Sequence, residues 1–149
     1  RLSQLAQLYE LNEGLFSQIL EVNDFKSIEK LFAVGVSEFW ETHYTFTKTS
    51  KKVKKPISAT LITLIWINVF IPLKYAYYQS LGKDVSESLI EELKTMTAES
   101  NSIIAQYQQL GVSVTTAFDT QLLLQQYKHY CQSKRCLDCA IGISILGRK

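Results

Sequence analysis

The sequence predicts an all-α fold: a single compact, orthogonal bundle of about eight to ten short helices around a buried central helix. Residues 57–78 are apolar on nearly every side, as the buried helix of a bundle is. Most other segments repeat apolar residues three and four positions apart, between capping and stop signals. Only residues 43–47 alternate large and small side chains as a strand does.

Helices are expected before the central one at residues 2–11, 15–22, 28–34 and 38–42. Leu2, Leu5 and Leu8 form an apolar stripe on the first of them. The residues that begin or end these helices are Gly14, Asp24 or Ser27, Gly35 and Ser37. Residues 43–56 then form a long connection with one extended piece, and connections of that length are often functional or mobile.

The central helix is expected from Ser58 to Ile71. Pro72 lacks a backbone N–H and its ring clashes with the preceding turn, so the helix should kink or restart there. The apolar part covers about 16 residues, fewer than the ~20 that a membrane span needs. We therefore expect the central helix of a soluble domain, with no membrane contact.

The remaining helices are expected at residues 73–81, 86–96, 101–110, 116–131 and 136–146. Ser86 and Asn101 are suitable caps for two of them. Thr116-x-x-Asp119 resembles a capping box, in which each side chain accepts a hydrogen bond from the other residue's backbone. The long helix that follows should turn Leu123, Leu124, Tyr127 and Tyr130 inward.

The net charge of +2 is unevenly distributed along the chain. Residues 48–55 hold five lysines and no acid, and residues 128–149 hold five basic residues against one acid. The rest of the chain holds six basic and thirteen acidic residues. Two basic segments on an acidic body indicate a local surface for an anionic partner and argue against a uniformly basic binder.

The 149 residues predict one domain, 1–149, and a start at Arg1 without methionine suggests a fragment of a longer protein. Residues 1–20 lack the apolar run and cleavage site of a signal peptide. Three cysteines cannot all pair within the chain. The reducing cytoplasm is therefore the expected location.

The lysine-rich segment is the candidate nucleic-acid contact. Lysines neutralise phosphates and aromatic rings stack on bases; the residues concerned are Tyr44, Phe46, Lys48, Lys51, Lys52, Lys54 and Lys55. The segment has no arginine fork, so any binding should be weakly specific for sequence. The alternative is a solvated loop that its two aromatic residues anchor to the core.

The cysteines at the C-terminal end are the candidate metal ligands. Cys131-x4-Cys136-x2-Cys139 has a spacing at which thiolates bind zinc or an iron–sulfur cluster. His129 could be a fourth ligand only if the helix ends between it and Cys131, because residues two apart on a helix point about 200° apart. The favoured alternative is that Cys136 and Cys139 are small core residues and no cofactor is bound. A disulfide or redox role is the third interpretation.

No enzyme motif stands out. Glu38, Glu41 and His43 are close in sequence, but surface glutamates and a capping histidine explain them better than acid–base chemistry. The sequence holds no Gly-rich phosphate loop, Walker motif or Ser-His-Asp pattern. We lean against an enzymatic role for this chain.

Four stretches of the sequence are distinctive: EFWETHYTF (38–46), INVFIPLKYAYY (67–78), the run from 101 to 131, and CQSKRCLDCAIG (131–142). Together they resemble one bacterial family, the one catalogued as domain of unknown function 2851. The tail motif is the most specific of them. The resemblance implies that this chain is the C-terminal helical part of a longer protein. It also implies an N-terminal, strand-rich part outside the chain that is similar to restriction-endonuclease-like nucleases.

These observations lead to one functional hypothesis and two alternatives. The leading hypothesis is a non-catalytic accessory domain that contacts nucleic acid, or another anionic partner, through the lysine-rich segment and the basic tail. The first alternative is a structural zinc or iron–sulfur site at the cysteines. The second is a scaffold that packs on the N-terminal domain of the same full-length protein.

Overall fold

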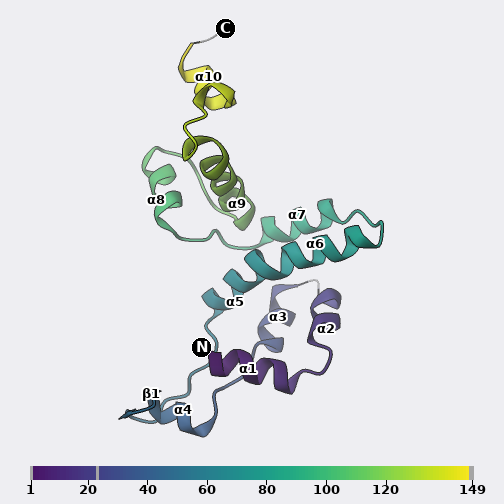
Figure 1. The fold of residues 1–149 in the computed structure, drawn as a ribbon, viewed down its shortest axis with the longest axis vertical. Helices are drawn as coiled ribbons and strands as arrows, with labels where there is room; N and C mark the ends of the chain where they lie inside the picture. The colour runs from purple at the N-terminus through teal and green to yellow at the C-terminus, as the bar shows by residue number, and fades with distance from the viewer. Residues whose placement is uncertain (1, 23, 148–149) are drawn as a thin grey trace. The chain divides into compact units, whose positions relative to one another are not determined.

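The computed structural model describes residues 2–22 and 24–147, and over them the fold is all-α with one short hairpin (Figure 1). The chain divides into two compact units, Arg1–Ser86 and Glu87–Lys149. The helical class that the sequence predicts is therefore confirmed. The single domain at 1–149 stays a prediction.

The first helices of unit 1 are α1 (Leu2–Leu11), α2 (Leu15–Glu21) and α3 (Phe25–Leu31). Gly14 between α1 and α2 has a φ of 68°, which a residue without a Cβ adopts at little cost. Asp24 caps α3, because its carboxylate accepts the backbone N–H of Ser27 at 2.9 Å. The predictions for Gly14 and Asp24 are confirmed, whereas α3 ends at Leu31, before the predicted stop at Gly35.

The buried face of α1 differs from the predicted stripe. Gln4 and Leu8, one turn apart, are buried, whereas Leu2 is 85% exposed. Burial of Gln4 is tolerated because its side-chain amide donates to the backbone carbonyl of Lys55. Leucine periodicity alone missed a core position occupied by a polar residue.

The core of unit 1 lies among α2, α3 and the long helix that follows. Its fully or nearly buried side chains are Ile19, Ile28, Phe32, Ile62, Trp66, Ile67 and Phe70. Lys74 is also buried, at 3% exposure, and its Nζ donates to the Val22 carbonyl at 2.6 Å. The same Nζ lies 5.0 Å from the centre of the Trp66 ring, so the cation is compensated inside the core.

The long helix does not break at Pro72. α5 (Ala59–Ile65), a π-helical segment (Trp66–Phe70) and α6 (Ile71–Ser80) are continuous (Figure 1). The backbone N–H of Ile71 donates to the carbonyl of Trp66, five residues back. This wider turn lies directly before the proline, where a regular turn would need the missing N–H and would clash with the ring. The predicted restart is therefore wrong, and the kink stays a prediction.

The continuity of this helix also changes the argument about its length. Ala59–Ser80 has 22 residues and a window of mean hydropathy 1.5, of which 33% is buried. By length and composition it could cross a membrane, although the core helix of a soluble protein passes the same test. The expectation that the segment is too short to span is wrong, and the absence of membrane contact stays a prediction.

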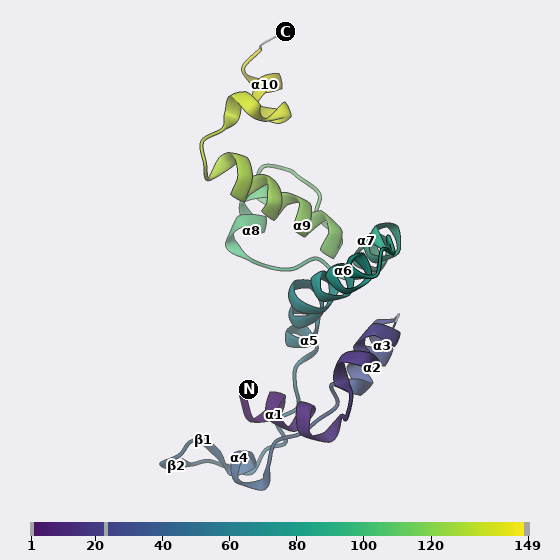
Figure 2. The same cartoon turned by 45° about the vertical axis from the view of Figure 1, so that its right-hand side comes forward.

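The predicted long connection contains a hairpin next to a short helix. α4 (Glu38–Thr42) leads directly into β1 (His43–Thr45), which pairs antiparallel with β2 (Lys48–Thr49) (Figure 2). Ser37 occupies the N-cap position of α4 but makes no side-chain capping bond there. Beyond β2, the backbone N–H of Val53 donates to the Glu41 carbonyl, so the chain folds back along α4.

The helices after α6 are α7 (Ser86–Thr95), α8 (Ser102–Gln109) and α9 (Ala117–Gln126). Asn101 caps α8 through bonds from two backbone N–H groups, and Thr116 and Asp119 form the predicted capping box. α8 and α9 lie side by side in both ribbon views (Figures 1 and 2). α9 buries Ala117 and Thr120; the side chains predicted to face inward are only half-buried, namely Leu123, Leu124, Tyr127 and Tyr130.

The C-terminal tail is not one helix from 136 to 146 as expected. A π-helical segment (Tyr127–Cys131) extends α9, and a short 3₁₀ turn (Cys136–Asp138) precedes α10 (Ala140–Ile145). Cys139 between the last two is extended, with φ −100° and ψ 127°. A Cβ at Gly142 would collide with the Cys136 carbonyl, so the tail can pack this closely only around a glycine.

Candidate functional site

The lysines of the segment 48–55 are not equivalent. Lys52 forms ion pairs with Glu41 at 3.1 Å and Glu38 at 3.8 Å. Its hydrogen bond to the Glu41 carboxylate raises the pKa of Lys52 above the usual lysine value. The two glutamates considered for acid–base chemistry therefore serve as partners of a lysine.

Lys55 is committed to the structure of the hairpin. Its Nζ donates to the backbone carbonyls of Trp40 at 2.6 Å and His43 at 2.9 Å. It also lies 3.7 Å from the centre of the Tyr44 ring. A lysine bonded in this way ties the end of α4 to the strand that follows, and it has little freedom to reach a phosphate.

Lys48, Lys51 and Lys54 are exposed and form no ion pair with any residue from 2–22 or 24–147. Lys48 begins β2, and Lys51 and Lys54 follow that strand. Three unneutralised ammonium groups on a short, exposed stretch create a local positive potential. The structure thus divides the predicted set into three free lysines and two that are paired within the fold.

The two aromatic residues of the segment remain largely in solvent. Tyr44 is 71% exposed and Phe46 is 80% exposed. Phe46 forms a T-shaped contact with Trp40, with ring centres 5.0 Å apart, and is still largely exposed. The alternative in which both rings anchor the loop in the core does not describe them, because rings anchored in the core are buried.

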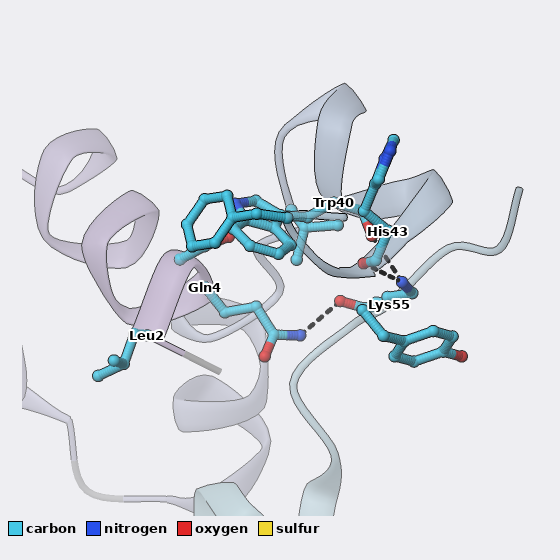
Figure 3. Close-up of a pocket in the computed structure, with 9 residues that line it drawn as sticks. Leu2, Gln4, Trp40, His43 and Lys55 are labelled. Carbon is cyan, nitrogen blue, oxygen red and sulfur yellow. Dashed lines mark hydrogen bonds between the residues drawn. The ribbon is translucent and has the colours of Figure 1, made fainter. Parts of the chain in front are cut away.

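A pocket of about 470 Å³ opens beside these residues (Figure 3). Trp40, Tyr44 and Phe46 contribute aromatic walls, and Gln4 spans the space toward Lys55. Ser3 lies in the lining, and its buried Oγ has no hydrogen-bond partner within the described part of the chain. Aromatic walls with a few polar groups are the usual lining of a site for a small planar molecule.

The sequence analysis did not select Ser3, Gln4 or Trp40. Gln4 lies one helical turn before the buried Leu8, which is the only local sign that it faces the core. Trp40 stood in the predicted short helix but carried no functional signal by itself. Convergence of α1 with the hairpin is a tertiary event between residues about 50 positions apart.

In unit 2 the three cysteines line one pocket of about 200 Å³. Cys131 and Cys136 are exposed, whereas Cys139 is buried, at 7% exposure. The small-core-residue interpretation therefore describes Cys139 alone. His129 is exposed and does not belong to this pocket.

Two side chains from other helices contact the thiols. Gln126 Nε2 donates to Cys139 Sγ at 2.9 Å, and the Tyr107 hydroxyl is 3.8 Å from Cys131 Sγ. A hydrogen bond from the backbone N–H of Gly142, together with the one from Gln126, lowers the pKa of the Cys139 thiol. Burial, followed by the contact with Cys131, raises the pKa of Tyr107 to about 12.

Within the described residues, the structure does not bring together the ligands that the predicted metal site would need. Over residues 2–22 and 24–147, no three His, Cys, Asp or Glu side chains are grouped so that they could hold a metal ion. Arg135, a member of the basic tail, is paired with Asp138 at 3.0 Å. Arg148 and Lys149 of that tail lie outside the described residues.

The family profile described as "Protein of unknown function (DUF2851)" matches residues 1–102. The chain belongs to this family. Neither a curated protein nor a solved structure matches it significantly. The DUF2851 match includes α4, the hairpin and the long helix and ends at the start of α8, so the resemblance of residues 103–142 stays a prediction.

Proposed function

We propose that unit 1 of this DUF2851 chain binds single-stranded nucleic acid as a non-catalytic accessory part of a longer, cytoplasmic bacterial protein. The observation that carries this proposal is the pairing of two exposed aromatic rings with three lysines that have no described acid partner. Proteins that bind single strands combine these two features, a positive track for the backbone and rings on which bases stack.

The arrangement favours a single strand over a duplex. Tyr44 and Phe46 are largely exposed, whereas the bases of a duplex are already stacked on one another. The pocket beside them has room for a planar ring against Trp40. The short hairpin offers no helix to enter a major groove, which is the usual route to sequence reading in a duplex.

Weak sequence preference follows from the same residues. The free cations are lysines, which act as point charges and do not form the bidentate contact of an arginine with guanine. Stacking on an aromatic ring tolerates any base. Another polyanion would satisfy the lysines but would leave the aromatic surface without a partner, so we favour nucleic acid.

The proposal is tested with fluorescently labelled oligothymidine and a duplex, using Phe46→Ala and the control Tyr9→Ala. Tyr9 lies on α1 and is 78% exposed. Tyr9→Ala therefore removes an exposed aromatic ring, as Phe46→Ala does, but outside the hairpin. We expect Phe46→Ala to weaken single-strand binding about tenfold, within the 1–3 kcal/mol of one stacked base. Tyr9→Ala should bind as the wild type does. Equal affinity of the wild type and Phe46→Ala would contradict the proposal.

A further inference from the structure

We infer that Cys136 and Cys139 form a dithiol site at which a peroxide produces an intrachain disulfide. The inference concerns unit 2 and is independent of nucleic-acid binding by unit 1. The observation behind it concerns one small pocket. Cys136 and Cys139, at the two ends of the 3₁₀ turn, line this pocket, and Gln126 of α9 donates a hydrogen bond to Cys139 there.

The turn gives the two thiols a spacing that suits a disulfide. Cys136 begins the 3₁₀ turn and Cys139 directly follows it, so the two cysteines are separated by one turn, about 6 Å at a rise of ~2.0 Å per residue. Disulfides need Cα atoms about 4.4–6.8 Å apart. The backbone N–H of Cys139 donates to the Cys136 carbonyl at 3.4 Å, which closes this turn.

The fold holds the turn against the first turn of α10. The Cys136 carbonyl occupies the space that a Cβ atom at position 142 would need. Gly142 has no Cβ atom and therefore permits the contact. Its φ is not positive, and the glycine is therefore needed here for its size. This contact fixes Cys136 relative to Cys139 before any bond between their sulfurs forms.

The two thiols differ in their surroundings. Cys139 is buried at the wall of the pocket and accepts the Gln126 amide at 2.9 Å, whereas Cys136 is exposed. A donor aimed at sulfur favours the anionic, nucleophilic form. Cys139 is thus placed to attack, and Cys136 to approach it afterwards. The pocket, which Ile141 and Ile145 also line, admits only a small reactant.

The chemistry is a two-step oxidation by a hydroperoxide. The Cys139 thiolate attacks one peroxide oxygen; a sulfur–oxygen bond forms, the oxygen–oxygen bond breaks, and the other oxygen leaves and takes up a proton. Sulfur is oxidised by two electrons to a sulfenic acid and the peroxide is reduced. Cys136 sulfur then attacks Cys139 sulfur, and the hydroxyl leaves as water with the Cys136 proton.

The arrangement of trypsin sites makes the pairing directly measurable. Cleavage after Lys128, Lys134 and Arg135 leaves Cys131 in the peptide 129–134, and Cys136 and Cys139 together in 136–148. The reduced full chain is treated with hydrogen peroxide, alkylated and digested. We expect peptide 136–148 to be lighter by the mass of two hydrogens and unalkylated, with Cys131 still alkylated. A link between the two peptides, or overoxidation without any disulfide, would overturn the inference.

The role of the folded pocket is tested by rate. We expect the disulfide to form about tenfold more slowly in Gln126→Leu, the equivalent of losing one hydrogen bond to a charged group. The neighbouring Gln125→Leu, at an exposed position of α9, should react as the wild type does. The wild type should also react more slowly in urea. Equal rates in folded and urea-unfolded protein would show that the pocket contributes nothing, and this outcome needs no variant.

Discussion

At the residue scale, five lysines that look alike in the sequence have different roles in the structure. Lys52 is paired with glutamates, Lys55 bonds two backbone carbonyls, and the other three have no acid partner in the described chain. Nothing in the composition of 48–55 separates them, because each partner lies on α4 or at its end. The charge of the segment was predictable from the sequence, but the division of its lysines was not.

This division predicts different stability costs for similar substitutions. Lys55→Met leaves two carbonyls without their donor and should lower the free energy of unfolding by about 1–3 kcal/mol. Lys51→Met, on the exposed part of the same segment, should change it by less than about 0.5 kcal/mol. Urea unfolding followed by circular dichroism measures both. If the two variants were equally stable, Lys55 would have no structural role.

At the element scale, the long helix shows how a local rule can be overridden. Proline ends helices in most sequences, yet here the π-helical turn at 66–70 carries the helix through Pro72. A proline that broke the helix would cost about 3 kcal/mol, and its removal would restore much of that. We expect Pro72→Ala to change the free energy of unfolding by less than about 1 kcal/mol. A gain near 3 kcal/mol in urea unfolding would contradict a continuous helix.

The capping box of α9 predicts a pH dependence. Hydrogen bonds from the backbone N–H groups of Thr115 and Thr116 lower the pKa of Asp119 in the folded chain. Because the folded pKa is the lower one, Asp119 stabilises the fold above its unfolded pKa of about 3.9. This stabilisation is lost as the pH falls through the folded value.

Asp119→Ala should therefore be less stable than the wild type at pH 7, and the difference should shrink below about pH 4. Glu87→Ala is the matched control, since Glu87 is an exposed acid in the first turn of α7. Thermal unfolding across a pH series measures both variants. A difference between Asp119→Ala and the wild type that stayed constant down to pH 2 would argue against the capping carboxylate.

At the scale of the whole molecule, local sequence signals predicted the limits of helices better than they predicted which face of a helix is buried. Helix limits marked by Gly14, Asp24, Asn101 and Thr116 were correct, because a cap depends on residues within one turn. The buried face of α1 and the pocket beside the hairpin were not predicted. Both depend on contacts between segments far apart in sequence, such as Gln4 with Lys55.

The cysteine site follows the same rule. The spacing 131, 136 and 139 indicated that the thiols act together, and all three do line one pocket. It did not reveal the break at Cys139, the packing on Gly142 or the donor from Gln126. Because of those features, a spacing that is typical of metal ligands also fits a pair of thiols that form a disulfide.

The most direct test of the central claim is the salt dependence of oligothymidine binding. Three proteins are compared: the wild type, a variant with Lys48, Lys51 and Lys54 changed to glutamine, and a control with Lys26, Lys30 and Lys83 changed to glutamine. All three control lysines are exposed and the two variants have the same net charge. Each phosphate contact to a single strand contributes about −0.7 to the slope of log affinity against log salt.

We predict that the hairpin variant loses about two units of that slope, because three contacts disappear, whereas the control keeps the slope of the wild type. That result would assign phosphate contact to the hairpin. Equal slopes in all three proteins, or the same loss in both variants, would contradict the account, because the positive charge of the hairpin would then have no special part in binding.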